Sequence, residues 1–292
     1  MICELCPRMC RALRDETRGE GVCRMPARPM AARAALHLWE EPCLSGTRGA
    51  GTIFFSGCPL GCMFCQNSVI SHENRGKPVT EERLYALFQM LAEQGAHNIE
   101  LVTPTHFSHV VERVLERPVP GGLPVVWNCG GYERVDTLRR LEGKVDIYLP
   151  DLKYLSAERA ARYSRAPDYP ATATAAIGEM YRQRGPVRFE GELLKSGVLI
   201  RHLLLPGGLA EAKRVMDWVA GSFPAGAVLF SLMAQYTPMG DLSATPEIDR
   251  PLRPSEVRAA RQYMSDLGLA GYVQDLEAVG EGFIPAFDFT GI

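Results

Sequence analysis

The chain has 292 residues, of which 46% are hydrophobic and 23% charged, as in a globular protein with a sizeable core. A formal net charge of −2 gives no electrostatic basis for binding nucleic acid or an anionic membrane surface. The sequence opens on no signal-peptide pattern and contains no apolar stretch near the ~20 residues that span a bilayer, so we expect a cytoplasmic protein without a membrane partner.

Residues 1–45 are rich in cysteine, arginine and proline and too poor in apolar residues to form a core of their own. Four cysteines follow the spacing C-x2-C-x3-C-x12-C, at Cys3, Cys6, Cys10 and Cys23. Nine cysteines in an unsecreted chain indicate metal chemistry rather than disulfides. These four fit an iron–sulfur cluster or a zinc ion, and the alternative is free thiols packed against the main domain. We predict a metal-binding extension over residues 1–45.

A second cysteine pattern follows the apolar run at residues 51–56. Cys58, Cys62 and Cys65 have the spacing C-x3-C-x2-C, with the aromatic Phe64 directly before the last of them. Three thiolates can hold three irons of a four-iron cluster and leave the fourth iron open to a ligand. A structural zinc site is the alternative, but such sites normally have four protein ligands, and no fourth cysteine lies nearby.

This loop resembles the signature of the radical SAM superfamily, C-x3-C-x-aromatic-C. The resemblance implies a [4Fe-4S] cluster on Cys58, Cys62 and Cys65, with S-adenosylmethionine (SAM) bound at the open iron. It also implies a low-potential electron donor of the flavodoxin or ferredoxin type.

From residue 46 onward, short apolar runs alternate with helical patterns. Six strands are predicted, at residues 53–56, 98–103, 124–128, 145–149, 198–205 and 227–233. Helices are predicted at residues 80–95, 110–117, 133–141, 156–164, 173–184, 210–220 and 254–267. Thr80 caps the first of these helices, and Pro254 and Gly268 bound the last.

Six strand–helix units predict a parallel sheet with helices outside it, and they are too few for an eight-stranded barrel. We therefore predict an α/β fold, a partial (βα)6 TIM-like barrel over residues 46–240, which is also the fold of the superfamily. Residues 241–292 are predicted to form a C-terminal helix and a tail that packs on the barrel.

Functional residues of parallel α/β folds gather at the carboxyl ends of the strands. The second predicted strand ends in Thr103-Pro104-Thr105-His106, where many relatives have a Gly-Gly-Glu-Pro run that receives the SAM amino group. The role would then fall on Thr103, Thr105 or backbone carbonyls, with Thr103 as our SAM-binding candidate. His106 either lines the site or caps a helix. The third strand ends at Asn128, a second SAM-binding candidate, before two glycines that would let the backbone approach a ligand.

The fourth and fifth strands end in charged residues. Asp151 and Lys153 extend the apolar face of the fourth and are our catalytic candidates, the alternative being an exposed ion pair. The run Asp-Leu-Lys resembles one that lies near SAM in glycyl radical activating enzymes, so Asp151 is also a SAM-binding candidate. Arg201 and His202 interrupt the fifth strand, and only one of them can point into the barrel. The run Ile-Arg-x4-Pro-Gly that starts at residue 200 resembles one in the activating enzymes, where the arginine contacts SAM. We therefore predict that Arg201 faces inward and contacts SAM while His202 faces the helices.

Two further positions are predicted from the ends of the strands. Cys129 follows the third strand, and a buried structural thiol is the favoured interpretation. Gln235 or Tyr236, after the sixth strand, would cover the adenine or the substrate.

The chain as a whole resembles the PflX-like branch, predicted homologues of pyruvate formate-lyase activating enzyme. The matching runs lie at residues 5–8, 39–43, 65–67, 94–98, 103–106, 131–133 and 283–288. This resemblance adds a glycyl radical enzyme as a candidate partner.

We therefore predict a radical SAM enzyme that abstracts a hydrogen atom from an unidentified small molecule or peptide. One alternative is an activating enzyme that generates a glycyl radical on a partner enzyme. A non-enzymatic alternative is an iron–sulfur or zinc protein that transfers electrons or acts as a scaffold.

Overall fold

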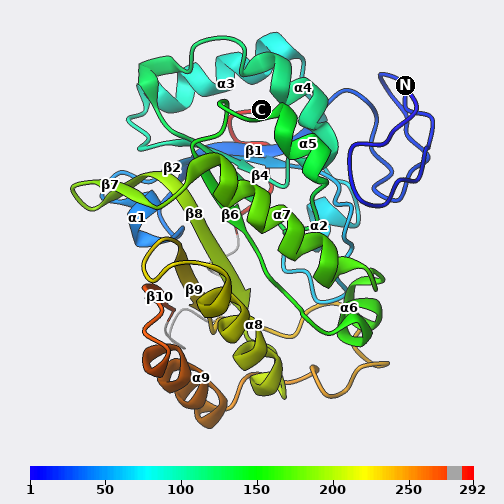
Figure 1. The fold of residues 1–292 in the computed structure, drawn as a ribbon. Helices are drawn as coiled ribbons and strands as arrows, with labels where there is room; N and C mark the ends of the chain where they lie inside the picture. Colours follow the sequence, from blue (N-terminus) through cyan, green and yellow to red (C-terminus); the bar gives the residue numbers. More distant parts are fainter. Residues whose placement is uncertain (275–284) are drawn as a thin grey trace.

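The computed structural model describes residues 1–274 and 285–292 and is built around one curved sheet (Figure 1). Its strands are β1 (Met30–His37), β2 (Ala50–Phe55), β3 (Lys77–Pro78), β4 (Ile99–Val102), β5 (Val125–Cys129), β6 (Ile147–Pro150), β7 (Arg188–Glu190), β8 (Leu193–Leu203), β9 (Leu229–Met233) and β10 (Gly271–Val273). Its α-helices are α1 (Pro42–Ser45), α2 (Ser68–Ser71), α3 (Glu81–Glu93), α4 (Ser108–Val114), α5 (Val135–Arg140), α6 (Ala157–Ser164), α7 (Tyr169–Arg184), α8 (Leu209–Ser222) and α9 (Pro254–Asp266).

The strand order is β10-β9-β8-β6-β5-β4-β2-β1-β3, and β7 forms a hairpin with β8. Neighbours from β2 through β10 run parallel, whereas β1 and β3 continue the sheet antiparallel beyond β2. Within the described residues the sheet does not close, since β10 and β3 remain its two edges. The predicted α/β fold with a partial TIM-like barrel is therefore confirmed.

The six predicted strands correspond to β2, β4, β5, β6, β8 and β9, but the prediction missed the strands at the sheet margins. β3, β7 and β10 have only two or three residues each, too few to show a strand periodicity. β1 is longer but lies within the cysteine-rich extension, where the composition indicated no sheet.

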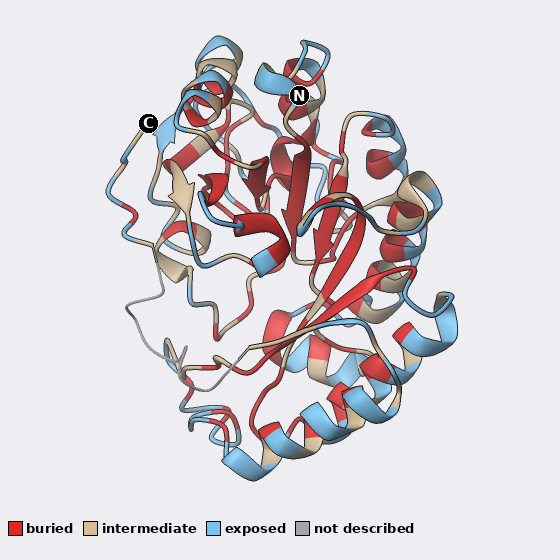
Figure 2. Cartoon of the chain, turned by 90° about the vertical axis from the view of Figure 1, so that its left-hand side faces the viewer, coloured by how far each residue is buried: buried red, intermediate tan, exposed pale blue. Residues whose placement is uncertain are grey.

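Helices α3 to α9 cover the outer face of the sheet (Figure 1), and their exposed sides face outward while the strands between them are buried (Figure 2). The main apolar core fills the space between sheet and helices. A smaller cluster lies on the concave side, where α1 contributes Cys43 and Leu44 and the strands contribute Val126, Leu149 and Leu199. The short helix α1 thus occupies part of the barrel interior.

The predicted signals at helix ends are confirmed. Thr80 precedes α3, and its hydroxyl accepts a hydrogen bond from the backbone N–H of Arg83 at 3.1 Å. Pro254 is the first residue of α9, and Gly268 follows its end with φ of +65°.

The first 29 residues form loops beside α5 (Figure 1). Their only β-pairings among the described residues are two isolated bridges, Ile2 with Leu13 and Arg14 with Gly19. Several side chains of this segment are nonetheless buried, namely Cys3, Leu5, Cys6, Cys23 and Met25. The division of the chain into domains at residues 45 and 240 stays a prediction.

Residues 285–292 lie beside β1, at the end of the sheet opposite to β10. The N–H of Phe289 donates to the carbonyl of Ala32 at 3.0 Å, and the N–H of Ala34 donates to the carbonyl of Thr290 at 2.8 Å. Of the family-like run at residues 283–288, Phe283 and Ile284 lie outside the described residues. No helix in the described ranges has the length and apolar character needed to cross a bilayer.

Candidate active site

A cavity of about 1170 Å³ opens at the carboxyl ends of the parallel strands. All the candidate site residues predicted outside the N-terminal extension line it together, namely Cys58, Cys62, Cys65, Thr103, Asn128, Asp151, Lys153 and Arg201. Gln235 and Tyr236 line it too. Parallel strands bring their carboxyl ends to one edge of a sheet, so residues up to 143 positions apart share this site.

The three cysteines of the loop after β2 face this cavity, and hydrogen-bond donors point at their sulfurs. The donors are the Ser164 hydroxyl, 3.0 Å from Cys62 Sγ, the Ser71 hydroxyl, 3.3 Å from Cys65 Sγ, and the Leu60 N–H, 3.4 Å from Cys58 Sγ. The aromatic Phe64 packs edge-on against Tyr163 and Tyr236. The loop is thereby held by contacts from α2, from α6 and from the segment after β9.

This donor set fits an iron–sulfur cluster. Anionic thiolates are stabilised by hydrogen bonds to sulfur, and such bonds tune cluster potential. Across the described parts of the chain, no three His, Cys, Asp or Glu side chains converge closely enough to bind a single metal ion. A four-iron cluster distributes its thiolates over several irons and therefore requires no such convergence.

Asp151 and Lys153 form a close ion pair beside this loop, with Lys153 Nζ 2.6 Å from Asp151 Oδ2. Their side chains are only 13% and 16% exposed, so the alternative of an exposed surface pair is wrong. Burial alone would raise the pKa of Asp151, but Lys153 and Arg201 outweigh it and hold that pKa below its usual value. Burial likewise opposes the charge on Lys153, yet Asp151 and the Cys62 sulfur raise the pKa of the amine.

Arg201 points into the barrel, as predicted, and its guanidinium contacts three different side chains. Nε donates to Asp151 Oδ1 at 2.9 Å, Nη1 to Glu40 Oε1 at 3.0 Å and Nη2 to Asn128 Oδ1 at 2.7 Å. His202 points the other way and its Nδ1 lies 2.7 Å from the carbonyl of Leu152.

Two acids of this network were missed in the sequence. Glu100 is fully buried on β4 and accepts a hydrogen bond from Asn128 Nδ2 at 2.6 Å. Burial and the neighbouring Glu40 raise the pKa of Glu100 well above its usual value. Glu100 could have been found as Arg201 was, because it is the only ionisable residue in an apolar strand. Glu40 lies before α1, outside any strand, and no local pattern identifies it.

The two glycines after β5 differ in their positions: Gly130 lines the cavity, where a ligand could approach its backbone, and Gly131 packs against β6. Gly131 has φ of +75°, and a Cβ atom there would lie 2.1 Å from the carbonyl oxygen of Asp151. Gly131 is therefore needed so that this loop can pack against the site strand β6. Tyr169, unnoticed in the sequence, donates to the carbonyls of Gly130 and Asp151 and accepts from the N–H of Lys153, at 2.8 to 2.9 Å.

The end of β4 has an unusual backbone. Thr103 has φ of +58°, a left-handed conformation that is rare for a β-branched residue, and its N–H donates to the carbonyl of Asn128 at 2.8 Å. His106 is fully buried, its Nε2 lies 2.7 Å from the carbonyl of Ser56, and it is absent from the cavity lining. Burial lowers the pKa of His106 to about 3.

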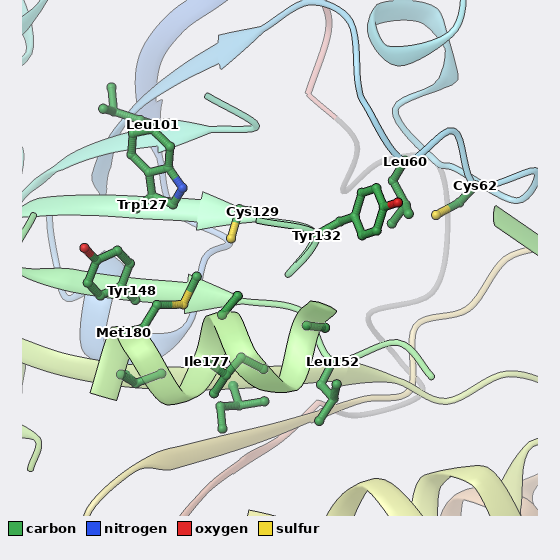
Figure 3. Close-up of a cluster of buried hydrophobic side chains, with 14 of the residues drawn as sticks. Leu60, Cys62, Leu101, Trp127, Cys129, Tyr132, Tyr148, Leu152, Ile177 and Met180 are labelled. Carbon is green, nitrogen blue, oxygen red and sulfur yellow. The ribbon is translucent and has the colours of Figure 1, made fainter. Parts of the chain in front are cut away.

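Cys129 is 2% exposed, which confirms the prediction of a buried thiol. Figure 3 shows its sulfur at the end of β5, near the side chains that pack between sheet and helix, whereas Cys62 lies with Leu60 on the loop beyond the strands. Trp127, Tyr148 and Met180 belong to the same core cluster as Cys129.

The four N-terminal cysteines lie near one another, although within the described residues no three of them converge on a single metal position. Cys3, Cys6 and Cys23 are buried and Cys10 is exposed. Burial, and to a smaller extent the proximity of the other three thiols, raises the pKa of Cys6 to about 12. The guanidinium of Arg14 donates to Cys3 Sγ at 3.3 Å.

Comparisons with known proteins agree with this architecture. The model of the radical SAM superfamily matches residues 52–218. The uncharacterized protein MJ0674 of Methanocaldococcus jannaschii is 28% identical over 267 residues, which cover 88% of this chain and 72% of that protein.

Among solved structures, SuiB of Streptococcus suis bound to its precursor peptide SuiA has a TM-score of 0.50 at 10% identity, over 75% of this chain and 47% of that chain. SuiB bound to S-adenosylmethionine has a TM-score of 0.50 at 11% identity, over 75% of this chain and 48% of that chain. The present chain thus spans about half the length of SuiB, and the likeness concerns the fold.

The family match covers more than half of the 292 residues and contains the cysteine loop as well as β2 through most of α8. The chain belongs to the radical SAM superfamily.

Proposed function

We propose that this protein takes a hydrogen atom from a small molecule or peptide bound in the cavity at the carboxyl end of the barrel. Membership of the superfamily indicates a SAM-cleaving enzyme with a [4Fe-4S] cluster. The observation that carries the proposal is the cavity itself, in which three cysteine thiols, the Asp151–Lys153 pair and Arg201 share one lining.

In this proposal Cys58, Cys62 and Cys65 hold the cluster, and Ser71 and Ser164 steady two of the sulfurs. When bound and reduced, such a cluster supplies the electron that cleaves SAM to methionine and a 5′-deoxyadenosyl radical, which abstracts the hydrogen atom.

The remaining roles fall to residues at the strand ends. Thr103, whose left-handed backbone is costly for a threonine, and Asn128 are proposed to bind SAM in place of the absent Gly-Gly-Glu run. Arg201, whose guanidinium contacts Asn128, and Asp151, which pairs with Arg201, are proposed to bind SAM as well. Lys153 keeps Asp151 ionised and adds a positive charge near Cys62.

The experiment is anaerobic reconstitution with iron and sulfide, followed by addition of SAM and dithionite and measurement of 5′-deoxyadenosine. We expect 5′-deoxyadenosine from the wild-type protein. The variant Cys62→Ala should retain the fold but lose both 5′-deoxyadenosine formation and the SAM-dependent change in the cluster EPR spectrum. Cys43→Ala, which alters a buried thiol of α1 that does not line the cavity, is the matched control and should keep both. A wild-type protein that holds its cluster but cleaves no SAM contradicts the proposal.

The PflX-like resemblance supports a second candidate, activation of a glycyl radical enzyme. In that case the substrate is a loop of a partner protein, and incubation with a candidate partner should produce a glycine-centred EPR doublet. Release of 5′-deoxyadenosine with no such doublet favours the small-molecule or peptide substrate.

We also propose that the four N-terminal cysteines hold a second metal centre, an iron–sulfur cluster or zinc, and that a flavodoxin- or ferredoxin-type protein of the cytoplasm supplies electrons. The support for the centre is the burial of three of these thiols in a segment with little regular structure. Eight irons per chain indicate a second cluster, and four irons with one zinc indicate a zinc site. Four irons with no other metal would contradict the second centre.

A further inference from the structure

Arg8 connects the N-terminal cysteine segment to the cysteine loop of the active site. It lies between Cys6 and Cys10 in the sequence. Its Nε donates to the carbonyl of Pro59 at 2.8 Å and its Nη2 to the carbonyl of Leu60 at 2.9 Å. Both carbonyls belong to the stretch between Cys58 and Cys62. A charged, planar donor therefore holds the middle of the cluster loop from outside.

The same guanidinium reaches the other side of that loop. Its Nη2 also donates to the carbonyl of Ser164 at 3.0 Å, and the hydroxyl of Ser164 donates to Cys62 Sγ at 3.0 Å. The ring of Tyr132 lies 5.3 Å from the guanidinium carbon. Arg8 thus fixes the cluster loop and the end of α6, which carries the donor to Cys62, relative to each other.

A second connection runs through Arg14. Its Nη1 donates to Cys3 Sγ at 3.3 Å and to the carbonyl of His106 at 2.7 Å. The imidazole of His106 pairs with the carbonyl of Ser56, two residues before Cys58. The N-terminal segment therefore touches the cluster loop at its start as well as at its middle.

The N-terminal segment also packs directly against the start of the cluster loop. Met25, two residues after Cys23, lies against Gly57, where a Cβ atom would be only 2.3 Å from Met25 Cγ. The backbone of Gly57 has φ of +80°, so any larger residue there would be strained and would displace Met25.

The position of Arg8 depends on a segment that has little regular secondary structure to stabilise its conformation. Residues 1–29 contain no helix, and their β-pairing within the described chain is limited to two isolated bridges. A metal centre held by cysteines at positions 6 and 10 would fix the turn that carries Arg8. In such small segments the free energy of metal binding contributes directly to the free energy of folding.

We propose that metal binding by Cys3, Cys6, Cys10 and Cys23 positions Arg8, and that Arg8 in turn fixes the geometry of the Cys58–Cys65 loop. The two cysteine sets are then coupled, and the N-terminal centre acts on the active site without touching SAM or substrate. This inference rests on the second metal centre put forward under Proposed function.

The test is a double-mutant cycle on the reconstituted full chain with Arg8→Gln and Cys10→Ser. Cys10 is exposed, so its substitution removes a metal ligand without opening the core. Each single variant should lower the rate of 5′-deoxyadenosine formation by about 10- to 100-fold, the range that a small misplacement costs. The EPR spectrum of the reduced four-iron cluster should change in both. The double variant should be no slower than the slower single variant.

Two further variants separate charge and geometry from a general effect on the segment. Arg11→Gln removes an arginine whose side chain is 70% exposed and which forms a surface ion pair with Glu4, and this variant should behave as wild type. Arg8→Lys keeps the charge but not the fork, and it should restore only part of the rate.

The outcomes are distinguishable. Additive losses in the double variant, or a wild-type EPR spectrum for Arg8→Gln, would overturn the coupling. A wild-type protein with four irons and no second metal overturns it as well, and leaves the proposed catalytic function standing. If the wild type forms no 5′-deoxyadenosine, the proposed function fails, while the coupling is still decided by the EPR spectra of the five variants.

Discussion

At the scale of single residues, the interior of the barrel is organised by Arg201. This one guanidinium bridges Asp151 at the end of β6, Asn128 on β5 and Glu40 before α1, and its side chain is only 13% exposed. Asn128 extends the network to Glu100 on β4. Buried charges are costly unless they are paired, and the removal of Arg201 would leave Glu40 without its counter-charge and Asp151 with Lys153 alone.

Substitution of Arg201 by Leu should lower the free energy of unfolding by about 3–5 kcal/mol, the usual effect of breaking a buried ion pair. The control is Arg182→Gln on α7, which removes an arginine 51% exposed that pairs with Glu142 and Glu179 and should cost under about 1 kcal/mol. Urea denaturation of the metal-free proteins under reducing conditions measures both. Equal effects of the two variants would show that the Arg201 network is not structural.

At the scale of elements, the site depends on how closely the loop after β5 packs against the end of β6. The contact is made by backbone atoms of Gly131 and Asp151 and is bridged by the Tyr169 hydroxyl from the first residue of α7. This contact also positions the Asp151–Lys153 pair, because the Tyr169 hydroxyl accepts a hydrogen bond from the backbone N–H of Lys153.

Gly131→Ala should destabilise the protein by about 2 kcal/mol or more, since the left-handed backbone costs about 1–2 kcal/mol and the new Cβ must also displace the Asp151 carbonyl. It should also weaken SAM binding, measured by equilibrium titration of the reconstituted protein. Gly143→Ala is the matched control, with φ of +80° but no atom within 4 Å of the added carbon. That variant should show the conformational cost alone and bind SAM normally.

The sequence predicted the strands that carry apolar runs and the helices that carry caps, because both are local patterns. It also placed Arg201 and Asp151 at one edge of the sheet, because parallel strands share a direction. Glu40, Ser164 and Tyr169 were missed for a physical reason. They lie in connections or at helix ends, and only the tertiary packing brings them to the site.

At the scale of the whole molecule, several buried acids make stability depend on pH. Burial raises the pKa of Glu41 to about 7 and that of Glu133 to about 8, from ordinary values near 4.5. Between pH 4.5 and these raised values, the folded chain therefore keeps the two groups protonated, whereas the unfolded chain has already released the protons. Their contribution to stability is complete below pH 4.5 and is lost as the pH rises through the folded values.

Between pH 5.5 and 7.5 the contribution of each such acid to the free energy of unfolding should fall by roughly 1 kcal/mol per pH unit while the acid remains protonated in the folded chain. Buried histidines with lowered pKa values, such as His106 and His109, act in the opposite direction in the lower part of this range, so the test is the difference in slope between two proteins. Glu133→Gln removes one of the two acids but keeps an acceptor for the Thr105 hydroxyl, so its slope should be less negative than that of the wild type. Urea denaturation of the metal-free protein at three pH values in this range gives both slopes. Parallel slopes would mean that Glu133 ionises normally in the folded chain.

The pairing of residues 289 and 290 with β1 has a consequence for behaviour in solution. An uncovered outer strand offers unpaired amides on which a second sheet can grow, and this is a common route to aggregation. Here β3 covers Met30 and Ala31, and the C-terminal residues occupy the amide of Ala34 and the carbonyl of Ala32. The tail thus protects this antiparallel margin of the sheet, formed by β1 and β3, from association between copies.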